Sequence, residues 1–388
     1  MKDVIFQNCK ITLRDEILDG QTVTVHEGKI AGVTGDHTAA VPESIVIDAG
    51  GRLLTPGLID IQINGGFGFD FTLNPESIWS VGRQLVRQGV TCFLPTIITS
   101  PIEKIQQALS IWKAGKPQNY QGANPLGWHV EGPFLNPQKK GAHQAEYLRL
   151  PDRNIIVDWS PENGVRLVTL APELTGQEAM IKELTSRGVV VSLGHSNASV
   201  EQAEQAVAWG AKAGTHLFNA MPELHHRQPG LTGAILANDE VFVGIIADGI
   251  HADARMVKLA YRVKGSNRLI LITDAMQALG MEPGIYKLAN KDVIVENASA
   301  RLQDGTLAGS ILSLPDAMQN IIQYAGCSLP EAVAMTTQTP AQLLGLTSKG
   351  SIAAGMDADL VLWDADFKTN SVIINGEIIY SQSDMNRN

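Results

Sequence analysis

The middle of the chain repeats one pattern, and that repetition limits the folds available to it. Short apolar runs, typical of buried strands, alternate with segments that mostly carry the 3.6-residue periodicity of an amphipathic helix. The runs lie near residues 58–63, 91–96, 126–131, 165–171, 189–194, 212–217, 242–247 and 268–273, and the helical patterns at 75–89, 102–114, 174–187, 199–210 and 252–263. Eight such units predict an α/β fold, a (β/α)8 barrel of the TIM type. A doubly wound open sheet is the alternative, but no GxGxxG follows the first run.

The two ends of the chain resemble each other rather than the middle. Residues 3–34 form short alternating patterns around a turn, and residues 358–380 do the same, with Asn375-Gly376 as a strong hairpin turn. Neither end is long enough for a core of its own. We therefore expect a small β-sandwich domain from residues 1–53 and 350–388, with the barrel, residues 54–349, inserted between them. A hairpin or extended insertion is expected at 282–305, and closing helices at 314–326 and 330–345.

Composition argues against several classes of partner. The formal net charge is −10, which disfavours nonspecific binding to nucleic acid. Cys9, Cys92 and Cys327 lie far apart without a CxxC pair, which is typical of a reduced, intracellular protein. The first residues carry charges too early for a secretory signal, and no apolar run approaches the ~20 residues that span a bilayer. We expect a cytoplasmic protein that binds neither nucleic acid nor a membrane.

Polar side chains gather at one end of the predicted strands. In a (β/α)8 barrel the active site lies at the carboxyl ends of the strands. The polar residues there are Gln62 and Asn64 at the first strand, His129 and Glu131 at the third, Glu173 at the fourth, His195 at the fifth, His216 at the sixth, Asp248 and His251 at the seventh, and Asp274 at the eighth. Burying such groups costs free energy unless they are paired or bind a metal ion.

Glu131, His195 and His216 form a candidate metal site. Two imidazoles and a carboxylate from separate strands match a catalytic metal ion that keeps one position open for water. The bound ion lowers the pKa of that water to about 7, and Asp274, a carboxylate on the last strand, is then the natural base. Alternatively, each histidine is a hydrogen-bonded core residue. The core interpretation explains any one of these histidines. It explains less well why all of them lie at the same end of their strands.

Two loops suggest an anionic ligand. The loop "FNAMPELHHRQPG" contains Asn219, Ala220 and Arg227, and "DGIH" ends in His251. Arg227 with a histidine could hold a phosphate, and backbone N–H groups at Asn219 and Ala220 could add to the site. The alternative is a solvated loop, which we favour for its His225 and His226. A third loop, "KKGAH", places His143 after the third strand, and its Lys139 and Lys140 are expected to be solvated.

Ten stretches together resemble the N-acetylglucosamine-6-phosphate deacetylases of the amidohydrolase superfamily. They are "PGLIDIQINGG", "HVEGPFLN", "KKGAH", "LAPE", "GHSNA", "THLFNAMP", "RQPGLTGAIL", "IIADGIHAD", "TDAM" and "LAGS", in this order between residues 56 and 310. "TPGLID" and the aspartate of the eighth strand are shared by the wider superfamily, but the combination is specific. The β segments that flank this region fit the small second domain of the family.

The resemblance implies a role for each matching residue. Asp274 corresponds to the catalytic aspartate, and His143 to a residue near the acetamido carbonyl. Glu131, His195 and His216 correspond to the metal ligands. The substrate contacts implied are Ala142, His143, Asn219, Ala220, Arg227, Asp248, His251, Leu307, Ala308 and Gly309. Relatives are commonly dimers, so a homodimer or higher homo-oligomer is expected.

Gln62 and Asn64 stand where many amidohydrolases carry His-x-His, the ligands of a second metal ion. Amides bind transition metals much more weakly than imidazole does, so the sequence resembles the one-metal branch of the deacetylases. We expect Gln62 and Asn64 to line the pocket and hydrogen-bond to each other, Asp274 or the bound water. Alternatively, they only pack the barrel mouth. Asp60, on the same strand, is expected to be structural.

The expected activity is hydrolysis of the N-acetyl group of N-acetylglucosamine 6-phosphate to glucosamine 6-phosphate and acetate. A metal-bound water is the nucleophile and Asp274 the general base and acid. One divalent ion per subunit is expected, with Zn2+ favoured and Fe2+, Mn2+ or Co2+ also accepted by this ligand set. Two alternatives stay open: an amidohydrolase with another amide substrate, and a non-catalytic barrel that binds amino-sugar phosphates.

Overall fold

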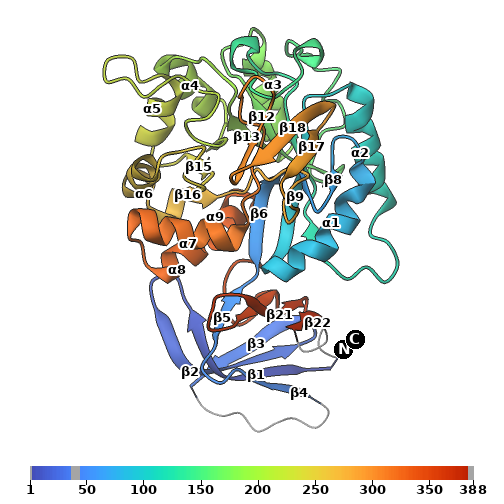
Figure 1. The fold of residues 1–388 in the computed structure, drawn as a ribbon, viewed down its shortest axis with the longest axis vertical. Coiled ribbons are helices and arrows are strands. Elements are labelled where there is room, and N and C mark those ends of the chain that lie inside the picture. The colour runs from blue at the N-terminus through green and yellow to red at the C-terminus, as the bar shows by residue number, and fades with distance from the viewer. Residues whose placement is uncertain (1, 36–43, 383–388) are drawn as a thin grey trace.

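The computed structural model describes residues 2–35 and 44–382. It has two parts, a strand-and-helix barrel and a smaller sheet domain that lies below it in Figure 1. The small domain contains strands from both ends of the chain, as predicted from their similar patterns. The predicted limits, 1–53 with 350–388 and 54–349, stay a prediction, and their residues 1, 36–43 and 383–388 lie outside the described residues.

The predicted (β/α)8 barrel is confirmed. Within the described part of the chain its eight strands pair in parallel in the order β6(Leu58–Ile63), β9(Val90–Ile98), β11(Trp128–Glu131), β12(Val165–Leu170), β13(Val190–Leu193), β14(Ala213–Gly214), β15(Phe242–Ile245) and β16(Leu269–Leu271). The short β10(Asn124–Pro125) also pairs with β9. The ring closes beyond β16, where Ala275 bridges to Ile63 and the Asp274 N–H donates to the Gln62 carbonyl at 2.8 Å. Asp274 therefore sits at the seam of the barrel.

Helices and short 3-10 turns lie between these strands and after the last of them. They are η1(Pro75–Ser77), α1(Ile78–Leu85), η2(Val86–Gln88), α2(Ile102–Ala114), η3(Pro137–Lys139), η4(Ala145–Tyr147), α3(Gln177–Ser186), α4(Val200–Ala208), α5(Gly230–Ala237), α6(Ala254–Arg268), α7(Leu314–Ala325), α8(Leu329–Ala334) and α9(Gln338–Leu343). The single helix expected at 330–345 was wrong: Thr337, at φ −133° and ψ −77°, separates α8 from α9. The sequence did not indicate α5, because its "GLTGAILA" is apolar without a polar face.

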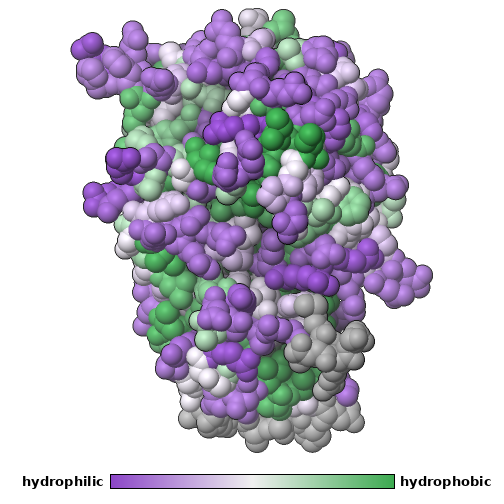
Figure 2. All heavy atoms as spheres, viewed as in Figure 1, coloured by the Kyte–Doolittle hydropathy of each residue, from purple (hydrophilic) through white to green (hydrophobic). Residues whose placement is uncertain are grey.

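An antiparallel sheet follows the eighth strand, where the insertion was expected. It contains β17(Gly284–Leu288), β18(Lys291–Glu296) and β19(Ser299–Arg301). Its inner face packs Val293, Val295 and Ala300 into a small apolar cluster, while Ile285 stays 72% exposed. Figure 2 shows hydrophobic residues on a mainly hydrophilic face in this region. A further two-stranded ribbon, β7(Gly65–Gly66) and β8(Phe69–Asp70), follows β6.

The small domain is one mixed sheet in the order β22(Glu377–Ser381), β21(Thr369–Ile374), β20(Leu360–Trp363), β5(Leu53–Pro56), β1(Val4–Thr12), β2(Ile17–His26) and β3(Lys29–Thr34). The sheet forks at β1, whose first half also pairs with β4(Ile45–Asp48). Leu360 and Leu362 face the core of this domain, and the alternate residues Val361 and Trp363 pack into the core of the barrel. The two parts therefore share β20.

In the ranges 2–35 and 44–382, no helix has the length and apolar character needed to cross a bilayer.

Candidate active site

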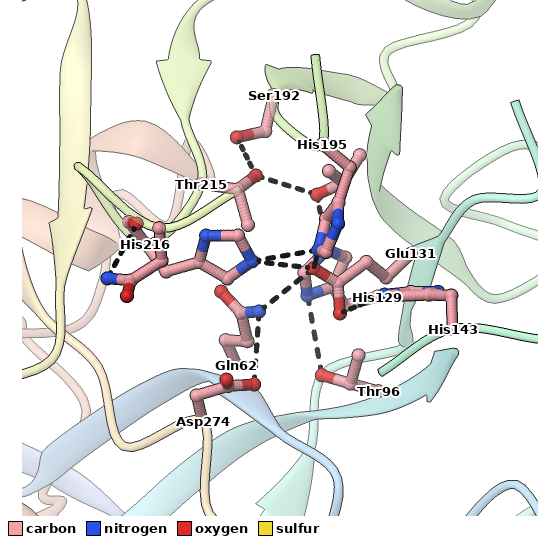
Figure 3. A network of polar contacts seen from close by, with 12 residues as sticks. Gln62, Thr96, His129, Glu131, His143, Ser192, His195, Thr215, His216 and Asp274 are labelled. Carbon is pink, nitrogen blue, oxygen red and sulfur yellow. Dashed lines mark hydrogen bonds and ion pairs between the residues drawn. The ribbon is translucent and has the colours of Figure 1, made fainter. Parts of the chain in front are cut away.

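Three predicted metal ligands converge at the carboxyl ends of three barrel strands, β11, β13 and β14. Glu131 is the last residue of β11, and His195 and His216 follow β13 and β14 by two residues. The Nε2 atoms of His195 and His216 lie 3.3 and 3.1 Å from Glu131 Oε1, and 3.1 Å from each other. Figure 3 shows the three side chains pointing toward one another. All three are buried, so the strand-end rule has brought three ligand atoms together away from bulk water.

The local hydrogen bonds favour a cation at this point. The Lys139 carbonyl lies 2.7 Å from His195 Nδ1 and can only accept, so this nitrogen carries the proton and Nε2 presents its lone pair. That lone pair faces His216 Nε2 and Glu131 Oε1. Burial alone would raise the pKa of Glu131, but the neighbouring imidazoles of His195 and His216 outweigh it and hold the pKa well below its usual range. An anionic carboxylate beside two imidazole nitrogens fits a divalent ion.

Asp274 lies beside this group, held by the amides of Gln62 on β6 and of Asn64 directly after it. Asn64 Nδ2 donates to Asp274 Oδ1 at 2.8 Å. Gln62 Nε2 lies 3.2 Å from the same oxygen and 3.3 Å from Glu131 Oε1, so it links the two carboxylates. Burial and the charge of Glu131 raise the pKa of Asp274, which brings it nearer to the range useful for a general base. The two amides thus occupy the space next to Asp274.

Asp60 supports the backbone that carries Asp274. Its Oδ2 accepts from the Thr273 hydroxyl at 2.6 Å, and its Oδ1 accepts from the Gln62 N–H. Burial raises the pKa of Asp60 to about 7. The Ser310 N–H donates to the Asp274 carbonyl at 2.9 Å, and the Ser310 hydroxyl donates to the Thr273 carbonyl at 2.5 Å. The seam between the first and eighth strands is therefore fixed on both sides of Asp274.

His143 presents a defined N–H to the site. The Thr99 backbone N–H donates to His143 Nδ1 at 3.2 Å, and a backbone N–H can only donate, so the proton of the neutral ring is on Nε2. That Nε2 lies 3.8 Å from Glu131 Oε2. Burial holds the pKa of His143 well below its usual range, which keeps the ring neutral. His143 can therefore donate one hydrogen bond to a ligand beside Glu131.

The site opens into a cavity that most of the predicted contacts line. The lining includes Asp274 and the three candidate metal ligands, together with Asn64, Ala142, His143, Asn219, Ala220, His251, Leu307 and Gly309. Among the described residues, four predicted ones are not part of the lining: Gln62, Arg227, Asp248 and Ala308. Asp248 accepts from His251 Nδ1 at 2.6 Å and so orients that ring. Ala308 is fully buried. Arg227 is exposed on its loop, as are His225 and His226, whose rings lie 4.5 Å apart.

Several lining residues were not expected from the sequence. They are Ile98, Gln138, Lys139, Gly141, Ile246, Leu288 and Thr306. Lys139 was expected to be solvated, yet it lines the cavity and its Nζ donates to the Met221 carbonyl at 2.8 Å. The sequence signal that Lys139 lies near the site was its place four residues before His143. Leu288 comes from the inserted sheet, and its position could not be read from its own strand pattern.

His129 is a core residue rather than a ligand. Its Nε2 lies 2.8 Å from the Thr169 hydroxyl and its Nδ1 3.3 Å from that of Thr96. Burial lowers the pKa of His129 to about 4 and keeps it neutral. The Thr169 hydroxyl continues to Thr215 at 2.7 Å, and Figure 3 shows this network of hydroxyl groups beside the candidate ligands. For this histidine the hydrogen-bonded core interpretation holds.

Comparison with known proteins places the chain among well-described relatives. Residues 53–379 match the model of the Amidohydrolase family. The chain is 41% identical over 352 residues to N-acetylglucosamine-6-phosphate deacetylase of Homo sapiens, covering 86% of this chain and 85% of that one. It is 35% identical over 386 residues to the enzyme of that name from Bacillus subtilis (strain 168), with 98% of both covered. A crystal structure of N-acetylglucosamine-6-phosphate deacetylase from Thermotoga maritima superposes with a TM-score of 0.88 at 34% identity, covering 97% of this chain and 100% of that chain.

Proposed function

The chain belongs to the amidohydrolase family and, within it, to the N-acetylglucosamine-6-phosphate deacetylases, and from this premise we propose how its own residues carry out the hydrolysis. The reaction converts N-acetylglucosamine 6-phosphate to glucosamine 6-phosphate and acetate. The proposal concerns which groups bind the sugar phosphate, which one moves protons and which would hold a metal ion.

Glu131, His195 and His216 would hold one divalent ion, with zinc favoured and iron, manganese or cobalt also compatible with two imidazoles and a carboxylate. When bound, such an ion supplies an acidified water and a positive charge beside the amide carbonyl. The fit rests on the three convergent ligand atoms and on the His195 tautomer fixed by the Lys139 carbonyl.

Asp274 acts as the base and then as the acid. Its carboxylate takes a proton from the attacking water, and its raised pKa favours that transfer near neutral pH. The protonated carboxyl then donates to the departing amine nitrogen as the C–N bond breaks. His143 Nε2–H donates to the carbonyl oxygen as negative charge develops on it, which is typically worth a few kcal/mol. Asn64 and Gln62 keep Asp274 in place through both proton transfers.

The rest of the cavity binds the sugar phosphate. Asn219, Ala220 and His251 line the cavity together and would contact the sugar and its phosphate, with Asp248 orienting His251. Ala142, Leu307 and Gly309 would contact the substrate next to His143. Ala308 would act by placing the loop of Leu307 and Gly309. The chain is proposed to form a homodimer or higher homo-oligomer in which Arg227, exposed in the isolated chain, reaches the phosphate.

One observation carries the proposal: a buried carboxylate of raised pKa, Asp274, stands beside three convergent metal-ligand atoms in the lined cavity. The test is release of free amine from N-acetylglucosamine 6-phosphate by metal-stripped protein, before and after zinc is added. Activity should depend on zinc. Asp274→Asn should bind zinc and substrate but lose about 10²- to 10⁴-fold in kcat.

The matched control is Asp239→Asn at an exposed position, which should leave kcat unchanged. Near-normal turnover by Asp274→Asn would remove this residue from the proton transfers. Full activity without metal would remove the metal site from the proposal.

A further inference from the structure

A single carboxylate joins the two loops that surround His195. Glu173 lies three residues beyond the end of β12, between the loop after β11 and the loop after β13. It is half-buried, and among the described residues it belongs neither to the candidate metal ligands nor to the lining of the cavity. The proposed function gives it no role, although its position at a strand end matches that of the site residues.

Glu173 accepts three short hydrogen bonds from two separate loops. Its Oε1 accepts from Asn136 Nδ2 at 2.7 Å and from the Asn197 backbone N–H at 2.6 Å. Its Oε2 accepts from the Ser196 hydroxyl at 2.7 Å. Hydrogen bonds to an ionised carboxylate are stronger than neutral ones, and these distances lie in their range. The carboxylate therefore ties residue 136 to residues 196 and 197.

The same segments enclose His195. The Asn136 N–H donates to the His195 carbonyl at 2.9 Å, and the Lys139 carbonyl accepts from His195 Nδ1 at 2.7 Å. A Cβ added at Gly141 would lie 3.3 Å from His195 Cε1, so this segment packs directly against the ring. Both the backbone and the ring of His195 thus contact residues 136–141, a segment that Asn136 joins to Glu173.

His195 also needs such support because of its backbone. Its φ is +51°, in the left-handed region that non-glycine residues rarely adopt and that persists only where the surroundings impose it. The residues on its C-terminal side, Ser196 and Asn197, both donate hydrogen bonds to Glu173. The carboxylate acts immediately next to the strained residue.

We propose that Glu173 is a positioning residue that sets the orientation of His195 as a metal ligand and joins it to the substrate-contacting segment that ends at His143. This inference rests on the metal site of the proposed function. Because residues 136–143 include Ala142 and His143, Glu173 also links metal binding to the placement of the groups that contact the amide. Partners that orient a metal ligand typically change metal affinity by 10- to 100-fold when they are removed.

The test compares Glu173→Ala with Glu173→Gln in the full-length protein. The alanine variant removes both acceptor oxygens and with them all three hydrogen bonds. The glutamine variant can keep three hydrogen bonds, with Oε1 accepting from Asn136 and Asn197 and Nε2 donating to the Ser196 hydroxyl oxygen. Zinc Kd is measured by competition with a chelating dye, and the melting temperature of the metal-free protein is measured separately. Glu178→Ala, which removes an exposed carboxylate on α3, is the control.

Glu173→Ala should raise the zinc Kd by about 10- to 100-fold, while Glu173→Gln and the control stay within a few-fold of the wild type. At saturating zinc, Glu173→Ala should still show a raised KM for N-acetylglucosamine 6-phosphate. Ser196→Ala removes one of the three donors, so it should also raise the zinc Kd, by a smaller factor. This variant replaces Glu173→Ala in the test if Glu173→Ala does not fold.

An unchanged zinc Kd together with a lowered melting temperature would overturn the proposal, because Glu173 would then be structural only. A Glu173→Gln variant as weak in zinc binding as Glu173→Ala would overturn the role of the three hydrogen bonds. Wild-type protein that binds no zinc would overturn this inference together with the metal site. Absence of deacetylase activity with the zinc differences intact would contradict the substrate assignment and leave the role of Glu173 standing.

Discussion

At the scale of single residues, strained backbone marks the proposed chemistry. His195, His216 and Asp274 have φ values of +51°, +31° and +48°. Non-glycine residues rarely adopt such values, and they cluster at sites where surrounding contacts impose them. For Asp274 those contacts are the hydrogen bonds of Gln62 and Ser310 to its backbone. The left-handed residue comes just after the end of its strand. The chain turns there, and the side chain points toward the centre of the barrel mouth.

Asn64→Leu tests the hydrogen bond from Asn64, the residue after β6, to Asp274. The hydrogen bond from Asn64 lowers the pKa of Asp274, so its loss should raise that pKa further. Leucine has a similar size and leaves little room for a replacement water. Because Asp274 must be ionised to accept a proton, the acid limb of the pH profile of kcat/KM should move to higher pH. The plateau should fall by no more than about tenfold, since backbone hydrogen bonds still hold Asp274.

The measurement is kcat/KM for the sugar phosphate from pH 5 to 9, with exposed Asn154→Ala as the control. An acid limb that stays in place or moves to lower pH would mean that Asp274 does not set it.

Some of these residues could be found from sequence and others could not. Glu131, His195 and His216 were found because they end strands, and strand ends meet at one face of a barrel. Lys139 and Leu288 were missed because loops set their direction, and no periodicity describes a loop. His129 has the same kind of position as Glu131, but its ring meets the hydroxyl groups of Thr96 and Thr169 instead. Which way a side chain turns at a strand end is decided by its neighbours.

At the scale of elements, α5 shows how an element without a sequence signal is held. Its residues are apolar on nearly all sides, and Leu231, Thr232, Ile235 and Leu236 are buried. No glycine caps its carboxyl end. Instead, Lys264 on α6 reaches under it and donates to the carbonyls of Ile235 at 3.0 Å and Asn238 at 2.5 Å. Such a contact comes from the next helix, outside the residues of α5, so the pattern of α5 alone could not indicate the helix.

Lys264→Met should destabilise the protein by about 1–3 kcal/mol, because two carbonyl oxygens lose their buried donor while the apolar stem is kept. Lys264 is 6% exposed, and this burial lowers its pKa to about 8. The measurement is the free energy of unfolding in urea at pH 7. Lys258→Met, on the same helix, is the control and should change it by less than about 0.5 kcal/mol. Equal stabilities of the two variants would contradict this role for Lys264.

At the scale of the whole molecule, the small domain and the barrel share one buried layer. The alternation along β20 sends Leu360 and Leu362 to one core and Val361 and Trp363 to the other, a period-two pattern with both faces apolar. The sequence showed that both chain ends form strands, but it could not show that one of them is covered on both sides. That depends on where the barrel lies. Because neither face of β20 is exposed, we expect the two parts to unfold together.

Lys349→Met tests this coupling at the junction. Lys349 Nζ lies 2.5 Å from Asp359 Oδ2 and 3.0 Å from Asp357 Oδ2, and Asp359 is 6% exposed. The Gly57 N–H donates to the Asp359 carbonyl at 2.8 Å, so this ion pair stands where the small domain enters the first barrel strand. Removing one partner of a buried pair leaves an uncompensated charge, typically at a cost of 3–5 kcal/mol. Calorimetry should therefore show one transition, at a lower temperature than in the wild type.

Lys287→Met, which breaks an exposed ion pair with Asp292, is the control and should barely shift the transition temperature. Two separate transitions in the wild-type protein would contradict the coupling, and an unshifted transition in Lys349→Met would show that the pair contributes nothing to it.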